Sequence, residues 1–298
     1  MQAVIQFNQF SKRFGGIPIV NGLNFEVLQG EIFALLGANG SGKTTSVRTL
    51  LGVYEPSEGE ALVNGRRYSA EMAPQVGYMP EERGLYANAK VLETLSYFGE
   101  LKGLSGKDAK RRSFTYLERV GLADKVNVQL KRLSGGQQQK VQLGAAIINN
   151  PELLILDEPT KALDPVTRSQ LMDLLLELNQ AGTTIVFITH QMEEVERIAN
   201  RVVMIHKGER ALYGTLSDVK ESFRNNTLKV VTEGAIPAGG QLYSACVNGE
   251  TAILSPNQGV TSQDILSYLL AQGVQVNEFA PNTPSLHDIF IKVSGLKA

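Results

Sequence analysis

The chain has 298 residues, a length that suits one large domain or two modest ones. Hydrophobic residues make up 43% and charged residues 20%, the balance of an ordinary globular protein that can fill a core. The net charge of −1 and the pI near 6.4 provide no overall basic field, so nucleic acid is not expected as a partner. The basic run at residues 107–112 is more typical of a solvated helix face than of a binding patch.

The cysteine count and the apolar runs bear on the compartment. Because Cys246 is the single cysteine, an internal disulfide is excluded and a reducing compartment is favoured; its neighbours alternate like a strand, which predicts a buried side chain. The N-terminus lacks the pattern of a signal peptide, and the apolar runs at 32–36 and 153–156 are far shorter than the roughly 18 residues of a membrane helix. We therefore expect a soluble, cytoplasmic protein that would need another chain to span a membrane.

Strand and helix patterns alternate along residues 1–221. Near the N-terminus, VIQFNQF and LNFEV alternate as in an antiparallel sheet. The apolar run at 32–37 is followed by a helix from Lys43 to Leu51, and residues from about 90 to 150 read as a polar helical insertion. Further strands are expected at 153–158, 183–190 and 202–205, and further helices at 137–149, 171–178 and 192–199. This order predicts an α/β fold: a mixed, largely parallel sheet with an antiparallel β subdomain and an inserted helical subdomain.

The composition changes near residue 221. Residues 1–221 carry 25 basic and 25 acidic side chains, whereas residues 222–298 carry 4 and 5. We therefore expect one domain at 1–221 and a small α+β domain at 222–298, joined in the polar stretch 220–226. The tail shows four strand-like runs, a helix at about 263–272 capped by Ser262, and a last helix with Pro284 near its first turn. It contains no obvious catalytic cluster, so a docking or regulatory role is expected.

The segment GANGSGKT, from Gly37 to Thr44, fits the phosphate-loop pattern G-x-x-x-x-G-K-[ST]. It lies between a predicted strand and a predicted helix, which makes an ordinary glycine turn a poor alternative. In such a loop backbone N–H groups surround the phosphates, Lys43 neutralises the β and γ oxygens, and the Thr44 hydroxyl ligates Mg²⁺.

Two acids follow the apolar strand LLIL. Asp157 is placed to hold Mg²⁺ through water, and Glu158 points elsewhere and is a candidate base for an attacking water. The alternative is that both acids cap the next helix. His190 ends the strand in FITH; it is either structural or a hydrogen-bond donor to the γ-phosphate or the water. A guanine-specific enzyme is disfavoured, because TKALD does not fit the [NT]-K-x-D pattern.

The segment LSGGQQQK, residues 133–140, holds no acid, histidine or cysteine, so it cannot perform acid–base or metal chemistry alone. Two glycines at the start of a helix suit an anion such as a phosphate, because the backbone comes close and the helix N-terminus offers free N–H groups. Since the chain already has a phosphate loop, this segment predicts contact with a second phosphate.

GANGSGKT, LSGGQQQK, LLILDEPTKALD and FITH, in this order and spacing, resemble the nucleotide-binding subunit of an ATP-binding cassette (ABC) ATPase. The resemblance covers about residues 2–220, and LSGGQ ahead of the LDE acids makes it specific. It implies ATP and Mg²⁺ as cofactors, a separate integral membrane permease, and a head-to-tail homodimer on the inner face of the cell membrane. In such a dimer, LSGGQ of one chain caps the γ-phosphate bound by the phosphate loop of the other.

The same resemblance assigns roles to individual residues. It gives catalytic roles to Lys43, Glu158 and His190, and metal contacts to Thr44, Asp157 and Glu81. Phe14 matches the aromatic that stacks on adenine, although a core phenylalanine in a β-hairpin is the competing interpretation. The remaining nucleotide contacts are Gly37, Asn39, Gly40, Ser41, Gly42, Lys43, Thr44 and Thr45, with Ser134, Gly135, Gly136 and Gln137 on the partner's ATP.

Two positions depart from the usual pattern of the family. Glu81 replaces the common glutamine and is either an Mg²⁺ ligand or part of a surface ion cluster with Glu82 and Arg83. Lys161–Ala162 replaces Ser-Gly in the dimer-interface loop that continues through residues 163–165, and is expected to alter the coupling of the two ATP sites. PEERGLY and SLHDIFIKVSG resemble the sodium-extrusion type of export ATPase, which has an extra C-terminal domain.

Three functions compete on these residues. The leading one is an ATPase that drives export through a permease. A soluble, non-transport ABC ATPase acting on nucleic acid or ribosomes is disfavoured, because the chain shows one cassette, no sustained heptads and no net positive charge. A non-hydrolytic binding module is disfavoured because Lys43, Asp157, Glu158 and His190 are all present.

Overall fold

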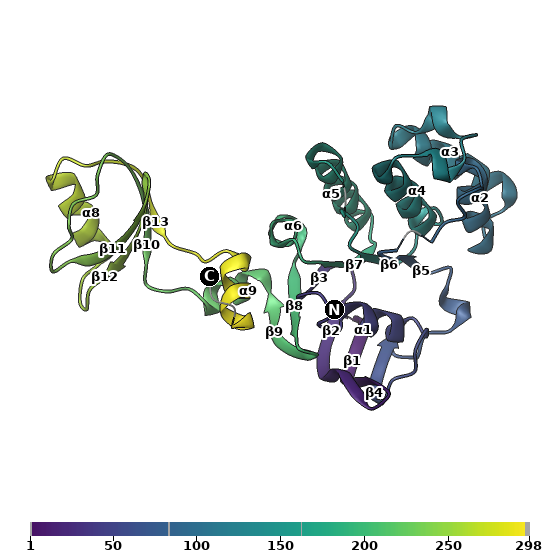
Figure 1. The fold of residues 1–298 in the computed structure, drawn as a ribbon, viewed down its shortest axis with the longest axis horizontal. Helices are drawn as coiled ribbons and strands as arrows, with labels where there is room; N and C mark the ends of the chain where they lie inside the picture. The colour runs from purple at the N-terminus through teal and green to yellow at the C-terminus, as the bar shows by residue number, and fades with distance from the viewer. Residues whose placement is uncertain (1, 83, 162, 296–298) are drawn as a thin grey trace. The chain divides into compact units, whose positions relative to one another are not determined.

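The computed structural model describes residues 2–82, 84–161 and 163–295. The chain forms two compact units, Met1–Leu216 and Ser217–Ala298 (Figure 1), which we treat separately. Helix α7 (Leu216–Ser222) lies at the division. Its acidic and basic side chains resemble the composition of the first unit, which is why composition placed the expected boundary a few residues later.

A six-stranded sheet forms the centre of the N-terminal unit, in the order β5-β6-β7-β3-β8-β9. Its strands run parallel except β9, which pairs antiparallel with β8. Four of the expected runs form strands here because they are apolar and buried throughout or nearly so, whereas β5 and β9 were not expected. The strands are β3 (Ile32–Leu36), β5 (Val76–Met79), β6 (Leu153–Asp157), β7 (Thr184–Thr189), β8 (Arg201–His206) and β9 (Glu209–Thr215).

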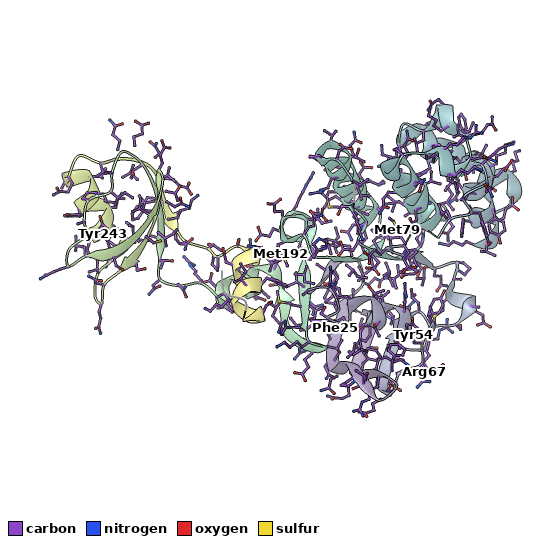
Figure 2. All side chains as sticks on the ribbon, viewed as in Figure 1. Phe25, Tyr54, Arg67, Met79, Met192 and Tyr243 are labelled. Atoms are coloured by element: carbon purple, nitrogen blue, oxygen red, sulfur yellow. The ribbon has the colours of Figure 1, made fainter. Side chains whose placement is uncertain are left out.

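A second, three-stranded antiparallel sheet has the order β2-β1-β4, with β1 at Ala3–Phe14, β2 at Ile17–Leu28 and β4 at Glu58–Val63. Its buried face shares a hydrophobic core with β3 and with α1 (Lys43–Leu50). Phe25, labelled in Figure 2, stacks on Phe33 with ring centroids 5.8 Å apart, which joins the two sheets. The phosphate loop between β3 and α1 is therefore anchored on a packed base.

Helices α2 to α5 lie on the opposite side of the six-stranded sheet from α1 in Figure 1. The inserted subdomain contains α2 (Val91–Leu101), α3 (Gly106–Arg119) and α4 (Gly135–Ile147). Single 3₁₀ turns occur at Ala70–Met72, Ala123–Lys125 and Leu130–Arg132. Helix α4 begins two residues before the expected Gln137, because Ser134 caps it in a reciprocal capping box. The basic run on α3 is largely exposed, as expected for a solvated face.

Two helices follow the acidic segment. Helix α5 (Pro165–Gln180) begins where Asp164 accepts hydrogen bonds from the N–H groups of Val166 and Thr167. Helix α6 (Met192–Ile198) follows directly on β7. Both helices start at the carboxyl ends of strands, so their first residues lie at the edge of the sheet that carries the phosphate loop. No helix in the described ranges is long and apolar enough to cross a membrane.

The C-terminal unit is an antiparallel sheet in the order β11-β12-β10-β13, with α8 (Ser262–Ala271) and α9 (Leu286–Ser294). Its strands are β10 (Leu228–Glu233), β11 (Tyr243–Asn248), β12 (Thr251–Pro256) and β13 (Gln275–Pro281). Leu254, Ile265 and Leu269 are among the buried residues that join this sheet to α8. The unit therefore has a hydrophobic core of its own.

Two expectations for this unit were wrong. Thr261, not Ser262, caps α8, because the Thr261 side chain accepts from the N–H of Asp264 and Asp264 accepts from that of Thr261. Cys246 is exposed rather than buried. It lies in β11, an edge strand of the sheet, and a period-2 pattern cannot distinguish an edge strand from a covered one. Pro284 lies just before the cap residue of α9, Ser285, and so outside the helix.

Candidate functional site

The phosphate loop connects the end of β3 to the start of α1. Its backbone requires glycine at Gly37 (φ +153°) and Gly42 (φ +107°). A Cβ atom at Gly37 would lie 2.4 Å from the Ile205 carbonyl oxygen, and one at Gly42 would lie 2.7 Å from Val20 Cγ2. No side chain caps the start of α1, so its first N–H groups are available to an anion. These features fit a phosphate of ATP.

Lys43 lies across this loop. Its Nζ donates hydrogen bonds to the carbonyl oxygens of Gly37 (2.8 Å) and Ala38 (3.1 Å). Burial lowers the pKa of Lys43 below its ordinary value, while the negative charges of Glu158 and Asp157 oppose that shift. The side chain is thus a buried cation whose hydrogen-bond partners are neutral carbonyl groups. Phosphate oxygens, which are negatively charged, would stabilise this cation further.

Asp157 ends β6 beside the start of α1. Its Oδ2 accepts a hydrogen bond from Thr44 Oγ1 at 3.1 Å. Burial raises the pKa of Asp157 to about 6, an effect increased by Glu81 and Glu158 and opposed by the Thr44 hydrogen bond and Lys43. A hydroxyl and a carboxylate side by side are oxygen donors of the kind that Mg²⁺ prefers, with nucleotide phosphates supplying further ligands. The pair therefore fits Mg²⁺.

Glu158 faces His190 rather than the Thr44–Asp157 pair. Its Oε1 lies 2.8 Å from His190 Nδ1, and its second oxygen, Oε2, is buried without a hydrogen-bond partner in the part of the chain that the structure describes. The two residues meet because they follow β6 and β7, which are neighbouring parallel strands. Glu158 has φ +50°, an uncommon backbone conformation for a side chain other than glycine. A buried carboxylate with one free oxygen suits the acceptance of a proton from water.

Glu81 pairs with Lys161. Its Oε1 lies 2.6 Å from Lys161 Nζ, so the two residues that depart from the family pattern contact each other. Glu82 pairs instead with Arg48 at 3.6 Å, and Arg83, the third member of the suggested surface cluster, lies outside the described residues, as does Ala162. Within the described ranges, no group of three or more histidine, cysteine or acidic side chains is arranged to hold a metal. Because Oε1 is engaged by Lys161, Glu81 could act as an Mg²⁺ ligand through its second oxygen or after it leaves Lys161.

The LSGGQ residues lie at the start of α4, where Ser134 is exposed and the two glycines and Gln137 are half-buried. Ser134 Oγ accepts from the N–H of Gln137, and Gln137 Oε1 accepts from the N–H of Ser134. One turn further, the buried Gln139 donates from Nε2 to the Pro159 carbonyl oxygen at 3.0 Å. The helix that begins with the LSGGQ residues thus also supports the backbone next to Glu158.

Phe14 is not a core residue. It is 41% exposed at the end of β1, its ring meets that of Tyr54 edge-on at 5.1 Å, and Lys12 Nζ lies 4.7 Å from its centroid. The ring is thus accessible for the adenine stacking that the resemblance implies, which stays a prediction. Tyr54 and Lys12 carried no motif signal.

Other residues of the site were also missed. Thr160 donates from its hydroxyl to the buried Glu194, and Gln139 contacts Pro159. These contacts join segments 20 to 34 residues apart, and Thr160, Glu194 and Gln139 lie in stretches that read as ordinary loop or amphipathic helix. The only signal was indirect: Glu194 falls on the inward face of the helix defined by Met192, Val195 and Ile198, where an acid needs a partner.

A glycine loop before a helix, with acidic residues and a histidine at the ends of neighbouring parallel strands, defines a P-loop nucleotide hydrolase. A model of the ABC transporter family matches residues 20–161, and one of the ATP-binding protein DrrA1-3-like C-terminal domain matches residues 214–294. An ABC transporter ATP-binding protein of Bacillus subtilis strain 168 is 35% identical over 296 residues, which cover 98% of this chain and 99% of that one. The chain belongs to the ATP-binding proteins of ABC transporters, a family that hydrolyses ATP.

Other relatives differ in the process that their names state. The linearmycin resistance ATP-binding protein of Bacillus subtilis is 34% identical, over 78% of this chain and 76% of its own. A methionine import ATP-binding protein of Lactobacillus johnsonii is 36% identical, over 74% and 66% respectively. Members of the family work with membrane permease subunits.

Solved structures agree with the fold. An ATP-binding subunit of an ABC transporter superposes with a TM-score of 0.69 at 30% identity, covering 74% of this chain and 93% of that one. A subunit of the ABC transporter complex cbiONQ of Clostridium perfringens gives 0.65 at 27% identity, covering 74% and 91%. The expected α/β fold and the family resemblance are therefore confirmed.

Proposed function

We propose that this chain is the ATP-hydrolysing subunit of an ABC exporter, and that two copies pair head to tail in the cytoplasm, on the inner face of the membrane, and act on a separate permease. The observation that carries the proposal is the complete hydrolytic set at one sheet edge: Lys43 in the loop, Thr44 against Asp157, and Glu158 against His190. The start of α4 supports the pairing, because Ser134 is exposed there and the N–H groups of Gly135 and Gly136, which the capping box does not use, are the ones that would meet an anion of the partner.

In the proposed reaction each residue has one task. Lys43 neutralises the β- and γ-phosphate oxygens, and Glu158 accepts the proton of the attacking water. His190 holds Glu158 by donating from Nδ1; its other ring nitrogen accepts from the water when the ring is neutral and donates to the γ-phosphate when the ring carries both protons. Thr44 and Asp157 would hold Mg²⁺, which supplies charge neutralisation of the phosphates. Glu81 would join them through its second oxygen or after release from Lys161.

A groove beside α2 supports docking of a permease. It encloses about 280 Å³ and its lining includes Tyr78, Leu85, Phe98 and Lys102. Tyr86, Tyr97 and Leu101 are large exposed apolar residues on the same loop and helix. The loop also contains Glu81, so a permease bound here would contact the segment that carries this candidate Mg²⁺ ligand.

The direction of transport rests on the second unit. The match of residues 214–294 to a DrrA-like C-terminal domain and the resistance relative support export. We propose an accessory role for this unit, because it has its own core and offers no metal-binding cluster among its described residues.

The test is the solution mass of purified Glu158→Gln protein with and without Mg-ATP. This variant should bind ATP but turn over about 10²–10⁴-fold more slowly, because the base is lost. We expect an ATP-dependent shift from monomer to dimer that disappears when Ser134→Arg is added. Ser105→Arg is a matched control, because Ser105 is an exposed capping serine on the neighbouring helix α3. A monomer throughout would refute the homodimer, and unimpaired turnover would refute Glu158 as the base.

A further inference from the structure

Glu194 is a buried acid that the proposed reaction does not use. It lies on α6, is 4% exposed, and accepts a hydrogen bond at Oε2 from Thr160 Oγ1 at 3.0 Å. Its other oxygen, Oε1, lies 3.5 Å from Arg168 Nε. Burial raises the pKa of Glu194, while Thr160 and Arg168 oppose the shift. Thr160 supplies the hydrogen bond to this acid, whereas Arg168 forms an ion pair with it: among the described residues neither Oε1 nor Arg168 Nε has a hydrogen-bond partner.

Thr160 connects Glu194 to the segment that carries the base. It is fully buried and lies two residues after Glu158. The backbone of Glu158 has φ +50°, a strained conformation that persists only where the surroundings hold it. The Glu158 N–H donates to the Ile188 carbonyl on one side, and the Thr160 hydroxyl fixes the chain on the other.

Arg168 connects the same acid to the histidine. Its Nη1 donates to Gln191 Oε1 at 2.8 Å, and Gln191 immediately follows His190. Glu194 is therefore linked through other residues to both partners of the 2.8 Å contact between Glu158 and His190, although it contacts neither of them. One side is reached through Thr160, and the other through Arg168 and Gln191.

We propose that Glu194 is a positioning residue, which acts through Thr160 and through Arg168 with Gln191 to hold Glu158 and His190 against each other. The inference rests on the proposed role of Glu158 as the base. A misplacement of about 1 Å in a catalytic group costs on the order of 10²-fold in rate. Loss of one support should therefore lower kcat while leaving ATP binding intact, since the network touches neither the phosphate loop nor the Thr44–Asp157 pair.

The test compares Thr160→Val with Thr160→Ser in the full-length chain. Valine has the shape of threonine but no hydroxyl; we expect kcat to fall about 10–100-fold with KM for ATP changed less than about 3-fold. Serine restores the hydroxyl and should restore kcat to within about 3-fold of the wild type. Thr184→Val is the matched control: Thr184 is buried on β7, and its hydroxyl accepts from the Gly30 N–H at the opposite end of the strand from His190. It should lower the melting temperature but not kcat.

A second comparison separates positioning from a general loss of structure. Added to Glu158→Gln, Thr160→Val should lower the residual rate less than about 2-fold, because the group that it positions is already gone. A further loss by the full 10–100-fold, or a normal kcat in Thr160→Val alone, would overturn the inference. If Thr160→Val does not fold, Gln191→Ala at the half-buried end of the network carries the test, with an expected fall in kcat of about 3–10-fold.

The two proposals fail differently. Near-normal turnover in Glu158→Gln would refute the role of Glu158 as the base, and with it the proposal that Glu194 positions a base. Loss of turnover in Glu158→Gln together with normal turnover in both Thr160→Val and Gln191→Ala would leave the base standing and refute only the role of Glu194.

Discussion

Asp157 and Glu158 are neighbours in the sequence but contact different partners. Asp157 accepts from the Thr44 hydroxyl, and Glu158 meets His190. The difference arises because Asp157 is the last residue of β6, whereas Glu158 turns out of the strand with a positive φ. Two adjacent carboxylates are thereby kept for two separate tasks, metal binding and proton transfer.

The raised pKa of Asp157 has a consequence for stability. The pKa is about 6 in the folded chain and 3.8 ordinarily, so between these values the folded state holds a proton that the unfolded state has released. Stability is therefore lost as the pH rises from about 4 through about 6, and the cost is complete above that range. Without nucleotide, Asp157→Asn should raise the free energy of unfolding at pH 8 by on the order of 1–3 kcal/mol, and by less at pH 5.

Urea unfolding of the variant and the wild type at both pH values measures this effect. Asp173→Asn serves as the control, because Asp173 is an acid on the exposed side of α5 and its removal should bring no gain. An Asp157→Asn protein no more stable than the wild type at pH 8 would show that the buried charge is not a net cost.

The motif residues of the site could be predicted from the sequence, because each motif is a short stretch whose role depends on the elements directly beside it in the chain. The phosphate loop needs a strand before it and a helix after it, and both are visible as an apolar run and a helical pattern. The pairing of Glu81 with Lys161 could not be predicted, because 80 residues separate them and only the packing of β5 beside β6 brings their loops together. The same holds for Thr160 and Glu194, which meet through tertiary structure alone.

At the scale of elements, the phosphate loop depends on how closely β3 and β8 pack. These strands pair in parallel, and the carbonyl of Ile205 on β8 lies against the site where Gly37 would carry a side chain. The loop can begin at the end of β3 only because no atom occupies that space. The glycine is thus required by the sheet as well as by the nucleotide.

We expect Gly37→Ala to lower the free energy of unfolding by roughly 2–4 kcal/mol, because a Cβ 2.4 Å from a backbone oxygen forces the strand or the loop to move. Gly30→Ala is the control. Gly30 has φ +79° with nothing within 4 Å of its Cβ position, so it carries the backbone strain alone, about 1–2 kcal/mol. Urea unfolding gives both values; equal losses would show that the close contact with Ile205 is relieved without cost.

Most strands and helices could be predicted, and their ends less well. Apolar runs and 3.6-residue periods located β3, β6, β7, α5 and α6 because burial decides them. Cap residues shifted the starts of α4 and α8, since the structure chooses the residue whose side chain reaches the third N–H. The exposure of Cys246 was missed because the alternation of residues along one strand does not reveal whether that strand lies at the edge or in the middle of a sheet.

At the scale of the whole molecule, each unit has its own hydrophobic core. We expect a chain of residues 1–216 to bind ATP with an affinity within about 3-fold of the full chain, since every residue of the site lies in it. A chain of residues 217–298 should unfold cooperatively and bind no nucleotide. Circular dichroism on heating and ATP titration measure both; a fragment 217–298 without a thermal transition would contradict its independence.

Helix α4 holds two roles at once in the proposed dimer. Its first turn would read the nucleotide of the partner, and Gln139 on the same helix holds the Pro159 carbonyl beside the chain's own base. If binding of a nucleotide by one chain shifts α4 of its partner, it also shifts the backbone beside the partner's Glu158. By thermodynamic linkage, binding of nucleotide at either site then changes the binding free energy at the other site by the same amount. In such a dimer, each chain responds through its helix α4 to whether its partner has bound ATP.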